Sequence, residues 1–165
     1  MICREFWSDD QEFGMRLADE VLQQVLYSCR QSALNETGGI LVGSYTDTLD
    51  CAEVAAASTA PSDSQKGRTW FHRGTNGLQR WLGMLWQHKR TYYLGEWHFH
   101  PYASASPSQT DNEQMRAIAN SLWYYCPEPL LMIIGGDPSA VWTLGVYVFP
   151  RNKGCVELLE KAKNA

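Results

Sequence analysis

Two histidines and an aspartate within one short stretch are the residues of this sequence best suited to chemistry. His98 and His100 stand two apart in a run of aromatic and apolar residues typical of a β-strand, and Pro101 ends that run. Because alternate residues of a strand point to the same face, both imidazoles are expected to lie side by side at a strand end. Asp111 follows eleven residues after His100, at the start of a predicted helix, and supplies a carboxylate.

Two neutral imidazoles and one carboxylate form a ligand set suited to a zinc ion. Structural zinc sites usually have four protein ligands, mostly thiolates, whereas catalytic sites keep one position open for water. No cysteine lies near this segment of the sequence. A metal bound here is therefore expected to serve hydrolysis.

The same residues also admit purely structural interpretations. A His-x-His pair occurs by chance on exposed strands. Ser108-x-x-Asp111 and Thr110-x-x-Glu113 both match a helix capping box, in which the hydroxyl accepts from a backbone amide and the acid reaches back. Capping would explain Ser108 and Asp111 without any metal, but it leaves the histidine pair at the same turn unexplained.

The composition indicates one ordinary globular domain over residues 1–165. The chain is long enough for one domain with a core and too short for two. With 44% hydrophobic and 19% charged residues, no long disordered stretch is expected. The formal net charge is -4 and no basic cluster is visible. Nucleic acid is thus not expected as a partner, because its phosphates are bound mainly by a basic face.

Cysteine usage and hydropathy favour a cytoplasmic protein without membrane contact. The five cysteines are an odd number, widely spaced and without a Cys-x-x-Cys pair, and they are expected to be small buried hydrophobic residues. The first residues lack a signal-peptide pattern, and no run approaches the roughly 18 apolar residues of a membrane span. These features favour a reducing compartment.

Apolar spacing predicts a mixed sheet flanked by helices, in the α+β or three-layer class. The three main helices are expected at about 9–30, 74–89 and 111–121, and the aromatic residues of the second are assigned to the core. A long loop is expected at 60–68. The remaining predicted elements are a weak edge strand at 1–7, a hairpin of 40–45 with 51–59, strands at 69–72, 92–100, 130–134 and 141–149, and a short helix at 156–163.

Glu36 changes the interpretation of the histidine pair. It stands directly before the glycine-rich strand that begins Thr-Gly-Gly-Ile, where a lone carboxylate has no helical partner. Together with His98, His100, Ser108 and Asp111 it resembles, position by position, the JAMM motif of the JAB/MPN metallopeptidases. The resemblance extends over most of the chain. It implies an MPN/JAB (cytidine-deaminase-like) three-layer fold, with a mixed β-sheet flanked by helices.

The resemblance also implies a role for each residue of the set. His98, His100 and Asp111 would bind one Zn²⁺ ion, which lowers the pKa of a water in the fourth position to about 7. Glu36 would act as general base on that water and pass the proton to the leaving amine. Ser108 would donate its hydroxyl to the oxyanion of the tetrahedral intermediate. This set is sufficient for an amidase.

The sequence around the histidines, Gly-Glu-Trp-His-Phe-His-Pro, is most similar to small bacterial deconjugases that accompany E1- and E2-like enzymes in CBASS antiviral operons. That similarity implies a protein substrate: the C-terminus of a cGAS-like nucleotidyltransferase joined by an amide bond to a target. Such a tail is expected to bind in extended form by β-strand addition, with the loop from Ala60 to Arg68 as one wall.

Three alternatives stay open from the sequence. The same site would also process a bacterial ubiquitin-like or sulfur-carrier protein. A non-catalytic MPN scaffold is disfavoured because such proteins typically lack a ligand or the glutamate, and both are present here. A DNA-repair-associated relative shares a similar signature but fits poorly with the acidic composition.

Three further residues, Glu96, His72 and His88, lie near or outside the motif. Glu96 lies two residues before His98, on the same strand face, and is expected either to orient a ligand histidine or to pair with a surface cation. His72 and His88 lack metal-type spacing and are expected to be exposed or to pack.

Overall fold

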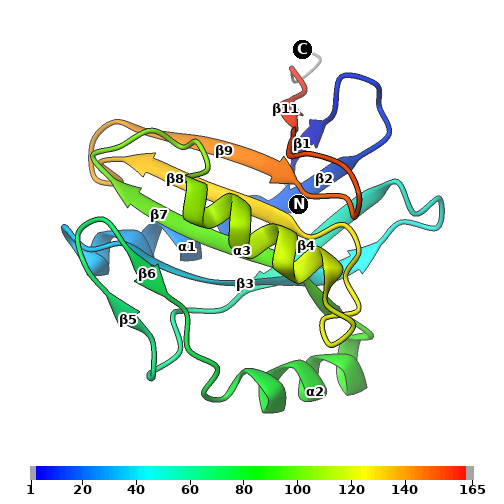
Figure 1. Cartoon of the computed structure of the whole chain (residues 1–165), viewed down its shortest axis with the longest axis horizontal. Helices are drawn as coiled ribbons and strands as arrows, with labels where there is room; N and C mark the ends of the chain where they lie inside the picture. Colours follow the sequence, from blue (N-terminus) through cyan, green and yellow to red (C-terminus); the bar gives the residue numbers. More distant parts are fainter. Residues whose placement is uncertain (1–2, 163–165) are drawn as a thin grey trace.

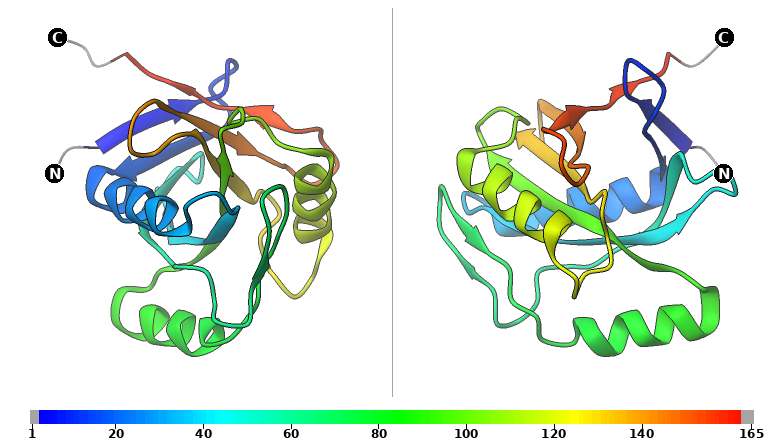
Figure 2. Two further views of the ribbon diagram at one scale, coloured as in Figure 1. Left: turned by 90° about the vertical axis from the view of Figure 1, so that its left-hand side faces the viewer. Right: turned by 45° about the vertical axis from the view of Figure 1, so that its right-hand side comes forward.

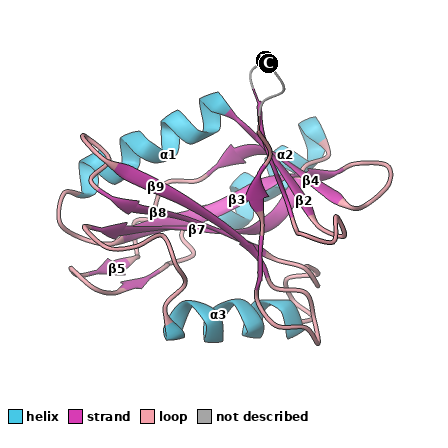
Figure 3. Cartoon of the chain, turned by 90° about the horizontal axis from the view of Figure 1, so that it is seen from above, coloured by secondary structure: helices cyan, strands magenta, loops and turns pink. Residues whose placement is uncertain are grey.

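The computed structural model, which describes residues 3–162, has a curved mixed sheet with helices on both of its faces (Figure 1). The helices are α1 (Asp19–Ser32), α2 (Leu78–Lys89) and α3 (Gln109–Asn120). The strands are β1 (Cys3–Trp7), β2 (Gly14–Ala18), β3 (Thr37–Tyr45), β4 (Cys51–Ala57), β5 (Gln65–Lys66), β6 (Phe71–His72), β7 (Tyr92–Pro101), β8 (Leu130–Gly136), β9 (Trp142–Val148), β10 (Val156–Glu157) and β11 (Leu159–Glu160). Seen from above, α1 and α3 lie on opposite sides of the sheet, which confirms the predicted α+β three-layer class (Figure 3).

The main sheet has nine strands in the order β10-β9-β8-β7-β3-β4-β2-β1-β11. The pairs β7–β8 and β2–β4 are parallel and the other neighbours are antiparallel. Strands β10 and β11 occupy the two ends of this order although a single residue, Leu158, separates them in the sequence. The segment 156–160 therefore joins the two edges of the sheet, which curves strongly to allow this (Figure 2).

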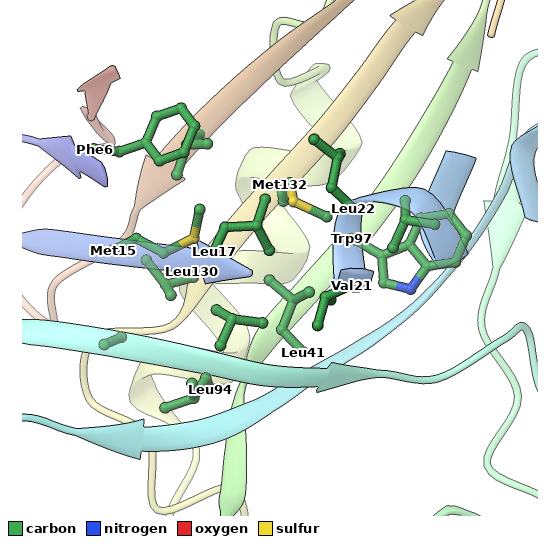
Figure 4. Close-up of a cluster of buried hydrophobic side chains, with 14 of the residues drawn as sticks. Phe6, Met15, Leu17, Val21, Leu22, Leu41, Leu94, Trp97, Leu130 and Met132 are labelled. Carbon is green, nitrogen blue, oxygen red and sulfur yellow. The ribbon is translucent and has the colours of Figure 1, made fainter. Parts of the chain in front are cut away.

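The two faces of the sheet separate the main core from the candidate site. On one face, alternate residues such as Leu41, Trp97 and Met132 pack with α1 and with β1 and β2 in the largest buried apolar cluster (Figure 4). On the other face, α3 covers β8 and β9, while α2 lies against β3. His98 and His100 alternate with core residues along β7, so they point to the α2 and α3 face.

The first predicted helix begins later than expected. Residues 9–18 do not continue α1: Gly14–Ala18 form β2, which pairs with β1 and β4. Met15 and Leu17, two residues apart, both point into the core, and a turn closed by Phe13 N donating to Ser8 Oγ (3.0 Å) connects β1 to β2. The predicted edge strand at 1–7 is present as β1, although Ile2 lies outside the described residues.

The predicted terminal helix at 156–163 is wrong for the residues that the structure describes. Val156–Glu157 pairs with β9, and Leu159–Glu160 pairs with β1. The apolar spacing reflects burial of Leu158 between the two short strands rather than one face of a helix. Residue 163 lies outside the described part of the chain.

Helix α2 is present, but its aromatic residues are not core residues. Leu85 is the buried residue of this helix, and Trp86 and Met84 are each 48% exposed. Trp81 and Leu82 are half-buried against β3 and β7. The helix is thus a thin cover over one face of the sheet, and it lies away from the main core in Figure 1.

The burial of the cysteines agrees only in part with the expectation. Cys29, Cys51 and Cys126 are buried as predicted, whereas Cys3 and Cys155 are exposed, so the prediction that all five are buried is wrong for these two. Among the described residues, the structure contains no helix that is long and apolar enough to span a membrane.

Candidate metal centre

His98, His100 and Asp111 meet at one buried point between β7 and the start of α3. His98 Nδ1 lies 2.7 Å from Asp111 Oδ1, and His100 Nε2 lies 3.3 Å from Asp111 Oδ2. All three side chains are buried. One potential ligand atom from each lies within 4.8 Å of the others. The parallel pairing of β7 with β8, which α3 connects, places the helix start beside the strand end as the sequence predicted.

The hydrogen bonding of His100 fits a bound cation. Its Nδ1 lies 3.3 Å from the Ser104 carbonyl oxygen, which only accepts, so Nδ1 carries a proton and Nε2 is left with its lone pair toward Asp111. Two acceptors that face each other need a cation between them. A proton is one solution: burial, the largest single influence, opposes a charged imidazole, but the hydrogen bond and charge of Asp111 together with Glu36 and the Ser104 carbonyl raise the pKa of His100. A divalent metal ion is the other.

Asp111 is held in the ionised form that metal ligation requires. Burial alone would favour the neutral acid, but the hydrogen bonds from His100, His98 and the Ser108 backbone hold its pKa well below the usual range. Two imidazoles and one carboxylate, with no thiolate, match catalytic zinc-type sites that leave a position open. The residues present therefore fit a metal ion.

The start of α3 shows that the capping and functional interpretations are compatible. Ser108 is the N-cap: its Oγ accepts from Asp111 N (3.0 Å), and Ser108 N donates to Asp111 Oδ2 (2.7 Å). The alternative box starting at Thr110 is not used. One carboxylate thus closes the capping box and faces both histidines. Ser108 itself is exposed, and among the described residues no protein group accepts its hydroxyl hydrogen, so this O–H is available to donate.

Glu36 lies beside the histidines, immediately before β3. β3 pairs with β7 so that Thr37 is opposite Phe99, which brings the preceding Glu36 alongside His100. Its backbone N donates to the Gly67 carbonyl oxygen (2.8 Å), so the connection between β5 and β6 fixes its position. The carboxyl is half-buried, and burial raises its pKa, partly offset by the nearby His100. A raised pKa moves a carboxylate toward the range useful for proton transfer at neutral pH.

Gly38 is required for β3 to approach the histidine strand this closely. A Cβ atom at this position would collide with the carbonyl oxygen of Trp97 and would lie 3.0 Å from Cδ2 of His98 and 2.8 Å from the Phe71 ring. The Phe71 ring in turn meets the His98 ring edge-on at 6.0 Å between centroids. The first glycine of the Gly-Gly pair therefore has a packing role at the site.

A cleft of about 380 Å³ opens beside His98. One wall comes from β6 and the residue after it, Phe71, His72 and Arg73, and the opposite wall comes from α3 and the turn that follows it. His72 and His88 are exposed, as predicted, but His72 also lines this cleft. The 60–68 loop contains β5, and its Gly67 carbonyl accepts from Glu36 N; its residues are not among those that line this cleft, and its contact with a substrate tail stays a prediction.

Glu96 does not orient a ligand histidine; the structure gives it another partner. Its two oxygens accept from Arg73 at 2.7 and 3.0 Å, and one also accepts from Tyr93 Oη at 2.8 Å. Of the two expectations, pairing with a cation is therefore correct. The pair is not on the surface, however, because both side chains are largely buried (5% and 13% exposed).

Sequence reasoning missed Arg73 and Tyr124, which share the cleft. Arg73 Nη2 also donates to Tyr124 Oη at 3.0 Å. Arg73 lies in the connection between β6 and α2, and it thus links β7, through Glu96, with the connection between α3 and β8, through Tyr124. The separation of 51 residues between Arg73 and Tyr124 left no local pattern to detect. The one available signal was Glu96, an acid on a strand face that otherwise carries buried groups.

Comparisons with known proteins agree with this geometry. A family model described as prokaryotic homologs of the JAB domain matches residues 18–145. The chain is 39% identical, over 94% of its length and 86% of the relative, to a CD-NTase/cGAS isopeptidase of Enterobacter hormaechei. It is 29% identical, over 62% of its length and 64% of the relative, to a protein of Sinorhizobium fredii named probable metalloprotease y4qB.

A solved structure shares the fold. The solution structure of protein DSY2949 from Desulfitobacterium hafniense aligns with a TM-score of 0.58 at 17% identity, covering 85% of this chain and 86% of the other. The resemblance predicted from Glu36, the histidine pair and Asp111 is confirmed at the level of the family. This chain belongs to the family of prokaryotic JAB-domain proteins.

Proposed function

We propose that this protein is a zinc-dependent isopeptidase of the JAMM type that cleaves the amide bond at the end of an extended C-terminal tail. The observation that carries the proposal is the placement of a half-buried Glu36 beside the buried His98, His100 and Asp111. The Ser108 hydroxyl completes this arrangement at the rim. All five residues of the motif are present, which argues against a non-catalytic scaffold.

Each residue of the chain has a distinct task in this mechanism. His98, His100 and Asp111 would hold the zinc ion, which when bound lowers the pKa of a water and polarises the scissile carbonyl. Glu36 accepts the proton of the attacking water and delivers it to the nitrogen of the leaving amine. Ser108, whose oxygen is anchored by Asp111 N, directs its O–H toward the oxyanion of the tetrahedral intermediate. Phe71, packed on His98, excludes bulk water from one side of the site.

For the substrate, the relative from Enterobacter hormaechei provides the support. By its name that protein acts on CD-NTase/cGAS conjugates, and the identity covers nearly the whole of this chain. We therefore assign to this chain the release of a cGAS-like nucleotidyltransferase from its targets in bacterial antiphage defence, in the cytoplasm and with E1- and E2-like enzymes as operon partners. The acidic composition argues against the DNA-repair role.

The test measures metal and cleavage on the same preparations. The wild-type protein, purified without chelators, should contain about one zinc per chain and cleave a nucleotidyltransferase tail peptide joined through its C-terminus to a lysine side chain. Glu36→Ala should keep the zinc but lose about 10²- to 10⁴-fold in kcat, the usual range for removal of a general acid–base group. Asp111→Ala should lose both zinc and activity.

Glu113→Ala is the matched control for Asp111→Ala, because Glu113 is an exposed acid of the same helix that bonds only Gln109 among the described residues. It should behave as wild type. Zinc-free wild-type protein, or full activity of Glu36→Ala, would overturn the mechanism. Faster cleavage of ubiquitin-like or sulfur-carrier fusions than of the nucleotidyltransferase tail would keep the chemistry and replace the substrate.

A further inference from the structure

A second hollow lies next to the cleft and has no part in the proposed mechanism. It has a volume of about 430 Å³. We call it the aromatic groove. Its lining consists mainly of apolar and aromatic side chains from α2, from the inner strands and from the connection between α3 and β8: Ile40, Leu78, Leu82, Tyr93, Trp123 and Tyr124.

The aromatic groove adjoins the cleft beside His98. Arg73 and Tyr124 line both hollows. The boundary that they form is fixed, because Arg73 is bonded to Glu96 and Tyr124, and the Tyr124 ring packs on Tyr93 at 5.0 Å between centroids. A chain that leaves the metal centre along the cleft and passes the Arg73 and Tyr124 side chains therefore enters the groove.

The walls of the groove favour an apolar occupant. The charge of Arg73 is neutralised by the two oxygens of Glu96, so it offers no free cation to an acidic ligand. Trp123 is 88% exposed on the outer edge of the groove, and an indole left in water beside other apolar side chains marks an interaction surface rather than a folding requirement. Leu78 and Leu82 on α2 form the opposite side and are only half-buried.

From these contacts we infer that the aromatic groove binds a large apolar side chain of the substrate's own tail, several residues before the scissile bond. This inference rests on the proposed function, because the occupant is the chain whose end lies at the metal centre. It adds a specificity site for substrate binding: the groove selects tails with an aromatic or large aliphatic residue at one distance from the cleaved amide.

The test uses ten-residue tails built from Ala, Ser and a terminal Gly, each joined through its carboxyl to the side chain of a fluorescent lysine amide. One Phe is moved through the positions upstream of the Gly. We expect a single position, or two neighbouring ones, to lower KM about tenfold or more relative to the tail without Phe, as burial of a Phe side chain predicts. kcat should change little, since the groove does not touch the reacting atoms.

Trp123→Ala should remove this Phe dependence and leave cleavage of the Phe-free tail unchanged. The exposed position of Trp123 means that the substitution leaves no buried cavity. Leu122→Ala is the matched control, because Leu122 is the neighbouring residue, is 74% exposed and does not line the groove. It should retain the full Phe preference.

Two outcomes would overturn the inference while leaving the proposed function intact. One is an equal KM for every position of Phe in an enzyme that cleaves all tails. The other is a wild-type dimer in light scattering that Trp123→Ala converts to a monomer with the Phe preference unchanged, which would make the groove a contact between copies of this chain. Absence of cleavage for every tail, in zinc-loaded protein, would instead contradict the proposed function.

Discussion

Helices α2 and α3 each have twelve residues and lie over the same face of the sheet, yet the fold holds them very differently. α3 starts in a complete capping box and buries Met115, Ile118 and Ala119. α2 starts at Gly77 without a side-chain cap and buries Leu85. The helix that carries a candidate metal ligand is thus the anchored one, and the helix that lines the aromatic groove is a loosely packed cover.

This difference follows from what each helix contributes. A metal ligand, the role proposed for Asp111, has to stay within fractions of an ångström of its position, which requires a helix end fixed by hydrogen bonds and packing. A groove for a tail needs accessible apolar surface, and α2 provides it because few of its side chains are used for folding. Tyr93, which packs in the apolar clusters of both helices, connects the two regions.

A Met-to-Ala substitution on each helix should give the largest difference between the two helices, measured as the change in the free energy of unfolding. Met115→Ala on α3 removes a fully buried side chain and should lower the free energy of unfolding by about 2–5 kcal/mol, because it leaves a cavity. Met84→Ala on α2, where the side chain is 48% exposed, should change it by no more than about 0.5 kcal/mol. Urea unfolding of both variants with equal m-values measures this. Similar losses would mean that α2 is as firmly packed as α3.

The N-terminus of α3 offers a sharper test, because in the proposed mechanism Ser108 both caps the helix and stabilises the oxyanion. Ser108→Gly should lower kcat by about 10²- to 10³-fold, as expected for loss of an oxyanion donor. It should cost only a few tenths of a kcal/mol of stability, because Gly is tolerated at an N-cap. Zinc content should stay at one per chain.

Ser108→Thr is the control for this substitution, because it keeps a hydroxyl in the same place and should retain both cap and activity. If Ser108→Gly kept its kcat, the hydroxyl would serve the α3 cap alone. The N-terminus of α2 has no equivalent experiment, since Gly77 carries no side chain that bonds the helix.

The features that the sequence predicted well depend on residues close together in the chain. The alternation of His98 and His100 along one strand and the three-residue step from Ser108 to Asp111 are short-range patterns, and the structure places these side chains together. Glu36 was found because the family motif joins two distant blocks. By contrast, Arg73 and Glu96 are 23 residues apart with no such motif, so their buried pairing required the fold.

The secondary-structure and burial predictions that were wrong have a common physical cause. Apolar periodicity shows which face of an element is apolar, but it does not show what covers that face. Leu17 fits both a helical stripe and the alternation of β2, and pairing with β1 and β4 decided between them. Leu158 fits a short helix until the two sheet edges on either side of it are known. For α2, apolar periodicity likewise predicted that the aromatic residues are buried in the core, whereas in the structure Trp86 is exposed.

The smallest expected effect concerns Gly83 in α2 and the N-cap residue Gly77, and it tests whether the backbone preferences of these glycines limit the stability of the helix. Gly83 lies in the middle of the helix, and an added Cβ would meet nothing within 4 Å. Gly83→Ala should therefore stabilise the protein by about 0.5–1 kcal/mol, because Ala loses less backbone entropy in a helix. Gly77 has equally open surroundings but a φ of +78°, so Gly77→Ala should destabilise by about 1 kcal/mol. If the two substitutions change the free energy of unfolding in opposite directions in urea, the backbone conformation of these glycines limits the stability of α2. If both substitutions change the free energy of unfolding in the same direction, the low stability of α2 comes instead from the small number of contacts around the helix.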